Sequence, residues 1–284
     1  MYSLLTTVPA CLVASCLGIP GEETESPWID ITPADSCCFT VSFSVINGIS
    51  ETELPVSRLD LFIYDADAVK ELLDRRTYTF LPDSVRFYGK DGDKTVVAIA
   101  NSPREFNDEA LSRYDSIELV SFSSEEDSPH SPLMGGQCAV APGAGTKLTL
   151  TPLLARIKLG EISNTMSGYI RLENPRVWLE NMNAWAELLR TAGFRPSQTI
   201  EKPPPKPLPY DIGIFAQTPG TELFCYPNDS SPDSGTPATA FVLECEIGGA
   251  TCSFRTPIPT IGRNTTTRID VSVSGPDSFE SKVY

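Results

Sequence analysis

The sequence has almost none of the patterns that mark an enzyme active site. It contains a single histidine, His130, within the Ser/Pro-rich stretch 128–132, and no G-x-S-x-G motif to provide a nucleophile beside it. That setting is typical of an exposed loop histidine. Glycine clusters such as 143–145 meet neither the P-loop nor the dinucleotide-binding spacing and are interpreted as turn residues. We therefore expect no catalytic residue, no cofactor and no enzyme activity.

Patterns for metal and nucleic-acid binding are also missing. No C-x-x-C pair occurs, and one histidine cannot complete a Cys/His zinc site. The acidic pairs Asp65/Asp67 and Asp91/Asp93 do not follow the EF-hand spacing and are typical of turns. Lys and Arg total 22 against 37 Asp and Glu, a formal charge of −15, and no basic run interrupts this acidity. These features predict no metal site and exclude nucleic acid as a partner.

Long apolar runs are confined to the first residues of the chain. The stretch 1–16 is too short to span a bilayer and is followed by glycine and proline, which favours a signal peptide. Val13-Ala14-Ser15-Cys16 resembles a bacterial lipobox, so we expect residues 1–16 to be a lipoprotein signal peptide and Cys16 to carry the lipid. The missing Lys or Arg ahead of the apolar run leaves two alternatives, a misplaced start codon and an ordinary buried strand. The acidic, proline-containing stretch 17–35 is predicted to be a tether.

The element that the sequence predicts most clearly is a β-hairpin near the C-terminus. Apolar and polar residues alternate along 241–247 and again along 250–256, as in half-buried strands. Gly248-Gly249 between them suits the two positive-φ positions of a type I′ turn. With this two-residue loop, Leu243 lies opposite Phe254, and every apolar residue meets an apolar partner.

The same register brings Cys245 opposite Cys252. Directly opposed strand residues have Cα atoms roughly 4.5–5.5 Å apart, which is within the range of a disulfide. Cys245 and Cys252 are therefore a candidate disulfide. The alternative is that both are small core hydrophobes, and the sequence leaves the two open.

Many further short strands with Pro, Gly and Asp between them predict an all-β protein of two β-sandwich domains with a few short helices. The continuous apolar run 95–100 indicates a strand buried on both faces. The Pro/Gly-rich break at 142–145 places the boundary between an N-terminal domain, 36–147, and a C-terminal domain, 148–284. Further expected strands are 39–45, 59–64, 85–88, 148–159, 170–179, 212–217, 222–226 and 269–273. Expected helices are 69–76, a short one within the loop 103–114, and 181–190. The proline-rich stretch 202–209 is interpreted as a stiff connector, the alternative being a docking peptide.

Short stretches between Cys16 and Ser274 follow a recognisable order. They are the Cys16 lipobox, 59–65 (LDLFIYD), 155–159 (ARIKL), 174–179 (NPRVWL), Asn183-Ala184, 189–196, 211–213, 222–228 (ELFCYPN) and Arg263-Asn264-Thr265. In this order they resemble the fimbrillin superfamily of Bacteroidetes, the subunits of type V pili, and particularly its anchor lipoproteins. The resemblance implies two transthyretin-like Greek-key β-sandwiches, a lipid-anchored location at the outer membrane or in the fimbrium, and other fimbrial subunits as partners by strand exchange.

Two features favour an anchor or accessory subunit over a stalk subunit. Polymerising members of the superfamily are cut by an Arg-specific protease early in the first domain, but here the first arginine, Arg58, adjoins an apparent core strand. The tail beyond Gly275 is also short for a donated strand. The competing hypothesis is a secreted glycan-binding or hydrolytic β-sandwich protein, which would show convergent carboxylates or an aromatic platform built from Trp28, Trp178 or Trp185.

Overall fold

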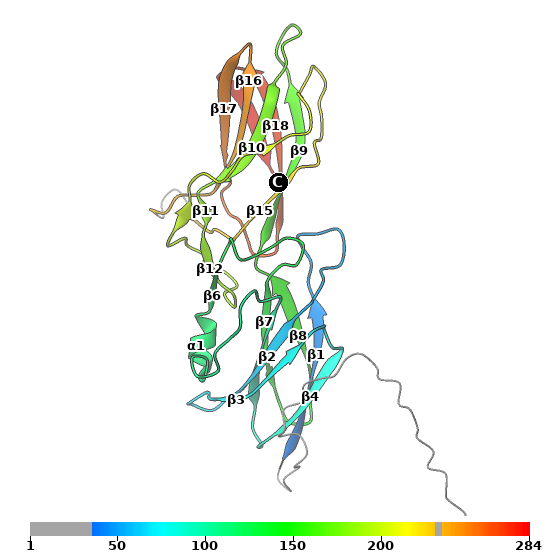
Figure 1. Cartoon of the computed structure of the whole chain (residues 1–284), viewed down its shortest axis with the longest axis vertical. Helices are drawn as coiled ribbons and strands as arrows, with labels where there is room; N and C mark the ends of the chain where they lie inside the picture. The colour runs from blue at the N-terminus through cyan, green and yellow to red at the C-terminus, as the bar shows by residue number, and fades with distance from the viewer. Residues whose placement is uncertain (1–35, 231–234) are drawn as a thin grey trace, which may run out of the picture.

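The computed structural model describes residues 36–230 and 235–284, which form an elongated molecule of two lobes (Figure 1). The predicted signal peptide, Cys16 and the tether 17–35 lie outside the described residues. Within the described part, no helix has the length and apolar character needed to cross a membrane. Nearly all regular structure is β-strand, which confirms the all-β class.

A seven-stranded sheet forms the first lobe. Its strands, in spatial order, are β3 (Leu72–Tyr78), β2 (Leu59–Asp65), β5 (Lys94–Ala100), β7 (Met134–Val140), β8 (Gly145–Pro152), β1 (Cys37–Val45) and β4 (Ser84–Gly89). The sheet curves around one core, because buried side chains from six of these strands form a single cluster. Its two edge strands approach each other where Arg76 Nη1 of β3 donates to the carbonyl of Arg86 in β4, at 2.9 Å.

Strands β2 and β5 are buried on both faces. Alternate residues face the first core, and the others, such as Phe62 and Val97, face a second cluster. Helix α1 (Tyr114–Glu118) and strand β6 (Ser121–Ser123) cover that second face, together with Leu188 and Tyr226 from the second half of the chain. The prediction that the run 95–100 is buried on both faces is confirmed.

The second lobe consists of two four-stranded sheets that enclose a third cluster of buried side chains. One sheet has the order β14 (Lys206–Pro207), β10 (Glu173–Glu180), β16 (Ala240–Ile247), β17 (Ala250–Pro257). The other has the order β15 (Glu222–Cys225), β9 (Ala155–Asn164), β18 (Thr266–Gly275), β19 (Ser278–Val283). Shorter strands β11 (Met182–Asn183), β12 (Trp185–Glu187) and β13 (Thr199–Ile200) lie between the lobes.

Strand β8 crosses the boundary expected between residues 147 and 148. It pairs with β1 along Gly145 to Leu150 and with β7 at Thr151 and Pro152, so all of it belongs to the first sheet. The strands of the second lobe begin with β9. The Pro/Gly-rich break at 142–145 is the turn that leads into β8 rather than a linker between the lobes.

The helices expected at 69–76 and 181–190 are wrong, and the short helix expected within 103–114 begins only at Tyr114, as α1. The stretch 69–76 contains the start of β3, which is held as a strand by pairing along β2 from Leu59↔Tyr78 to Tyr64↔Leu72. The stretch 181–190 contains β11 and β12, and β12 pairs with β6 of the other half, Ala186 lying opposite Phe122. In both cases tertiary strand pairing outweighs a helical spacing of apolar residues. The expected strand 212–217 forms only isolated bridges.

The C-terminal hairpin has the predicted register. Leu243 pairs with Phe254 and Cys245 with Cys252, and the turn glycines Gly248 and Gly249 have φ values of 59° and 83°. Both cysteines are buried free thiols, and burial raises the pKa of Cys245 to about 12. The disulfide stays a prediction.

We expect the protein, once it has been exported through an oxidising compartment, to contain a disulfide between Cys245 and Cys252. Because the bond closes a short loop, reducing it should lower the free energy of unfolding by about 2 kcal/mol. Peptide mapping of protein that was denatured and alkylated without reductant should find Cys245 and Cys252 joined by a disulfide and not alkylated. Cys225, which is also buried, is the control and should be alkylated. Alkylation of both residues in the denatured, unreduced protein would rule the bond out.

Candidate functional site

The junction between the lobes is organised around one arginine. Arg263 lies in the connection between β17 and β18, and its side chain is largely, though not fully, withdrawn from solvent. It donates hydrogen bonds only to backbone carbonyls, those of Gly135, Thr151, Pro152, Leu188 and Arg190. Burial lowers the pKa of Arg263 to about 10, which leaves it cationic at neutral pH. A single side chain from the second lobe thus binds carbonyls at the ends of β7 and β8 and in the segment after β12.

The next residue, Asn264, extends this contact toward β1. Its Oδ1 accepts the N–H of Gly48 at 2.9 Å, and its N–H donates to the carbonyl of Leu154 at 3.0 Å. Asn264 itself has a positive φ of 55°. The backbones approach so closely that a Cβ on Gly48 would lie 2.0 Å from the carbonyl oxygen of Asn264. The two lobes are therefore joined by directed hydrogen bonds and close contact rather than by a flexible linker.

A buried carboxyl group adjoins this junction. Asp127 Oδ1 accepts the N–H groups of Ser128 and Leu133, each at 2.8 Å. Burial raises the pKa of Asp127 to about 6, although these hydrogen bonds and the charge of Arg263 act in the opposite direction. Tyr226 of the second lobe lies beside it and donates its hydroxyl to the carbonyl of Ser123 at 3.1 Å. Asp127 thus titrates near neutral pH at the contact between the lobes.

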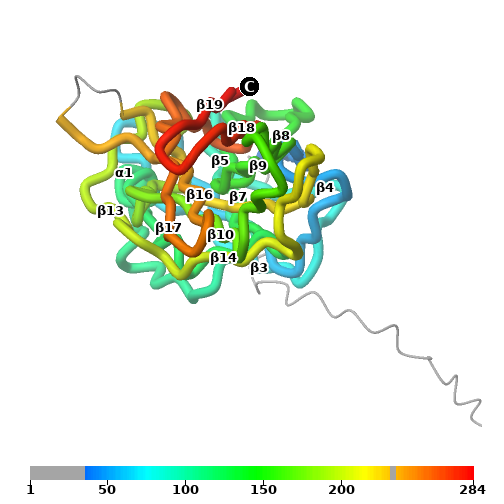
Figure 2. The backbone as a smooth tube through the Cα atoms, turned by 90° about the horizontal axis from the view of Figure 1, so that it is seen from above, coloured from blue at the N-terminus to red at the C-terminus, as the bar shows by residue number. Residues whose placement is uncertain are grey.

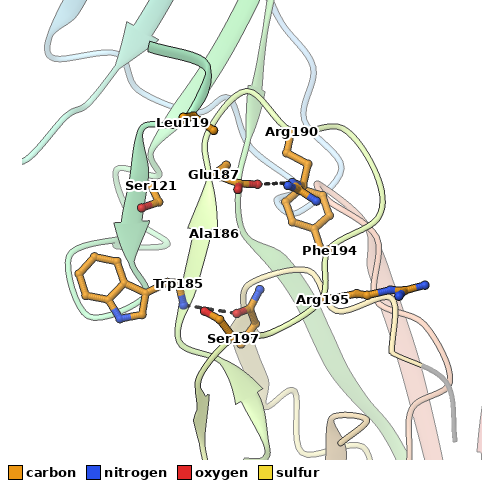
Figure 3. A pocket seen from close by; sticks show the side chains of 10 residues that line it. Leu119, Ser121, Trp185, Ala186, Glu187, Arg190, Phe194, Arg195 and Ser197 are labelled. Atoms are coloured by element: carbon orange, nitrogen blue, oxygen red, sulfur yellow. Dashed lines mark hydrogen bonds and ion pairs between the residues drawn. The ribbon is translucent and has the colours of Figure 1, made fainter. Parts of the chain in front are cut away.

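A small cavity of about 210 Å³ lies next to β12 (Figure 3). Its charged groups are Glu187, which is ion-paired with Arg190, and Arg195. No group in its wall forms a nucleophile–base pair, and the described residues contain no cluster of three His, Cys, Asp or Glu side chains that could hold a metal. His130 is exposed, as expected. This cavity offers no arrangement for catalysis.

The tryptophans do not form the aromatic platform that a glycan-binding alternative would require. Trp178 in β10 is buried, with Lys202 Nζ 5.0 Å from its ring centroid. Trp185 in β12 is 42% exposed at the rim of the cavity in Figure 3. Trp28 lies outside the described residues. Of the two described tryptophans, only Trp185 is available to a ligand.

The first strand, β1, is an integral part of the sheet of the first lobe. It pairs antiparallel with β4 and parallel with β8. Phe39 and Val41 are fully buried, and the Phe39 ring stacks on Phe87 with centroids 5.0 Å apart. Removal of β1 would open the core and leave two strands with unpaired backbone groups.

Arg58, in the connection between β1 and β2, is held by two carboxylates. Its Nε donates to Asp60 at 2.7 Å and its Nη2 to Glu105 at 2.8 Å. Asp60 is fully buried and also accepts hydrogen bonds from Arg75 and Thr77. An Arg-specific protease can bind the Arg58 side chain only after its hydrogen bonds to Asp60 and Glu105 are broken.

The last strand, β19, forms an edge of the second lobe. It pairs with β18 alone, and its residues alternate between exposed and half-buried. Phe279 packs on Phe254 with ring centroids 5.2 Å apart. Figure 2, which looks down the long axis, shows β18 and β19 at the periphery with the C-terminus beside them. The nine-residue tail therefore contains a strand that sequence reasoning missed.

Comparison with solved structures gives the chain its fold family. A putative cell adhesion protein of Bacteroides eggerthii is 12% identical, with a TM-score of 0.62 over 89% of this chain and 96% of that one. A fimbrilin of Porphyromonas gingivalis is 13% identical, with a TM-score of 0.59 over 84% and 90% of the two chains. A fimbrial assembly protein of Parabacteroides distasonis is 14% identical, with a TM-score of 0.57 over 88% and 96%.

The chain shares its fold with these fimbrial and putative cell adhesion proteins. At these identities the likeness concerns the fold. No family model matches the chain, and no curated protein does. The resemblance inferred from short, ordered stretches is confirmed at the level of fold, even though no single stretch is specific for the fimbrillin fold.

Asp127 makes the stability of the junction pH-dependent. The raised pKa means that the folded protein favours the protonated carboxyl, so this contribution is complete below pH 4 and is lost as pH rises through about 6. Asp127→Asn keeps an uncharged acceptor. The variant should match wild type at pH 4 and exceed its free energy of unfolding by up to about 3 kcal/mol at pH 7.5.

Urea unfolding across this pH range measures the difference. Glu125→Gln, at an exposed carboxyl two residues away, is the control and should leave the pH profile unchanged. A difference between Asp127→Asn and wild type that stays constant with pH would contradict the assignment.

Proposed function

We propose that the chain is a cell-surface lipoprotein that acts as an anchor or accessory subunit of a type V pilus, in pilus assembly and adhesion. The observation that carries this proposal is the integral first strand: the fimbrillin fold is complete with its own β1 paired between β4 and β8. A subunit that keeps this strand stays connected to its N-terminus and hence to a lipid on Cys16. We further propose that both lobes are transthyretin-like Greek-key sandwiches, with a division between β8 and β9.

The chain length between Cys16 and β1 fits attachment to a membrane surface. About 20 residues separate them, and such a segment reaches at most about 70 Å when extended. β1 begins at Cys37, at one end of the long axis, and the second lobe occupies the other end (Figure 1). Anchoring through Cys16 would therefore leave the second lobe directed away from the outer membrane.

The ion pairs of Arg58 support retention of β1. Cleavage there would require the loss of hydrogen bonds to Asp60, which is buried and could not regain them from water. Donation of a strand by another subunit into the site of β1 would in turn require β1 to leave a fully buried core position. We therefore place subunit contacts elsewhere on the molecule.

We propose that strand exchange with other fimbrial subunits involves β19. It is an edge strand with one paired neighbour, and its half-buried residues contribute less to the core than those of β1. A strand from a neighbouring subunit would pair with β18 in its place, which conserves the ladder hydrogen bonds. The chain is then a non-enzymatic component held by its lipid at one end and by another subunit through the β18 edge.

Replacement of Cys16 tests the proposed attachment. In the bacterium that produces the chain, Cys16→Ser should move it from the membrane fraction to the medium or periplasm, because the acyl chains are lost. Cell-bound fimbriae should fall in parallel. Cys11→Ser is the matched control, because it changes a cysteine in the same segment and leaves the lipobox residue Cys16 unchanged. Retention of Cys16→Ser in the membrane fraction, with normal cell-bound fimbriae, would refute the anchoring role.

A further inference from the structure

Exposed aromatic and aliphatic side chains gather on two loops of the second lobe. The loop between β9 and β10 carries Tyr169 and Ile170, and the segment before β15 carries Tyr210, Ile214 and Phe215. Tyr169 is 93% exposed and Phe215 75%. Large apolar side chains left in water at one place on a surface are a common sign of a binding site.

The two loops line an open cavity of about 460 Å³. That volume lies within the range of small-molecule sites. Its wall combines the side chains of Tyr169, Ile214 and Phe215 with three polar ones, Arg171, Asp211 and Gln217. Apolar walls with a few polar groups are the composition of a ligand pocket rather than of a packing defect.

Backbone hydrogen bonds fix the two loops to each other and to β9. Leu172 and Ile212 exchange two bonds, of 2.9 and 3.0 Å, and Ile162 and Gln217 exchange two more, of 2.8 and 2.9 Å. Asp211 Oδ1 accepts the N–H of Asn174 at 2.9 Å. The cavity is therefore preformed, and a ligand would not need to order its walls.

The polar groups of the cavity have unused bonding capacity. Gln217 Oε1 has no hydrogen-bond partner among the described residues, although the atom itself is shielded from solvent. Within the described residues, Arg171 forms no ion pair, and the second carboxylate oxygen of Asp211 accepts no hydrogen bond. The site thus presents guanidinium donors and two kinds of acceptor around an apolar surface.

We propose that this cavity binds a neutral saccharide. A pyranose ring has a flat C–H face that packs against Tyr169 or Phe215, and a rim of hydroxyls that donate to Asp211 and accept from Arg171. An acidic sugar is disfavoured because Asp211 lies in the wall and the chain carries a formal charge of −15. A purely apolar ligand would leave Arg171 and the second carboxylate oxygen of Asp211 without new partners while displacing water from them.

Saccharide binding goes beyond the proposed pilus role and does not depend on it. It can be measured on the purified chain, whether or not that chain is a pilus subunit. The cavity lies in the second lobe, away from β1 and from the junction. On a molecule attached through Cys16, it would face away from the membrane. A failure to bind saccharide would therefore say nothing about membrane attachment through Cys16. A failure of the Cys16→Ser test would likewise say nothing about saccharide binding.

Saturation-transfer NMR of the full mature chain with glucose, galactose, N-acetylglucosamine and their β-linked disaccharides tests the proposal. We expect saturable binding in the millimolar range for at least one sugar, with the largest transfer to ring C–H protons. Tyr169→Ala and Phe215→Ala should each weaken binding by about tenfold. Both side chains are exposed, so neither variant should alter thermal unfolding.

Tyr88→Ala is the matched control, since Tyr88 is a 52% exposed aromatic residue on β4 of the other lobe, and it should bind the sugar like wild type. Absence of saturable binding to every sugar would overturn the proposal. So would binding that Tyr169→Ala and Phe215→Ala leave unchanged. Self-association of the chain that these two variants abolish, without sugar binding, would instead assign the surface to a second copy of the chain and would also overturn the proposal.

Discussion

The hydrogen bonds of Arg263 are the interaction on which the arrangement of the molecule depends. One largely buried guanidinium donates to five carbonyls that come from β7, β8 and the segment after β12, and no carboxylate among the described residues accepts a hydrogen bond from it. Only arginine has enough donors in a fixed fork to do this, and each buried carbonyl left without a donor would cost about 1–3 kcal/mol. The second lobe is thereby held against the ends of the first sheet, and Asn264 secures the adjacent contact with Gly48.

This junction explains why the two halves share a core. The cluster that covers the outer face of β2 and β5 includes Leu188 and Tyr226 from the second half of the chain. β12 completes a short ladder with β6, and Asp127 lies where the halves meet. Neither lobe buries its apolar surface fully without the other, so the molecule behaves as one elongated unit with its proposed attachment at one end and its exposed aromatic loops on the other lobe.

Local signals allowed much of the fold to be predicted. Gly248-Gly249 and the alternation beside it fixed the hairpin register, because a one-residue slip would turn apolar residues to solvent. The run 95–100 was correctly interpreted as a doubly buried strand because a continuous apolar pattern has that meaning in a sheet. Failures occurred where pairing is long-range: β12 is a strand only because β6, more than sixty positions earlier, pairs with it. The tail strand β19 was missed because its alternation is weak.

The candidate sites were less accessible to sequence reasoning. Arg263 stands in a polar stretch, and nothing in that stretch indicates that its acceptors come from segments more than seventy positions away. The cavity between Tyr169 and Phe215 likewise joins two loops with no shared motif, whereas Trp178 lies in the core and Trp185 lines a different cavity. The proposed lipid site at Cys16 could be suggested from sequence alone, because a lipobox is a short contiguous pattern.

The central claim is that this fimbrillin fold keeps its first strand and stays attached through Cys16. Mass spectrometry of the mature N-terminus, on protein isolated from the cells that make it, tests that claim most directly. The account predicts a diacylated Cys16 as the first residue, followed by an uncut chain through Arg58 and β2. A mature protein that begins at or after Leu59, without β1, would contradict it.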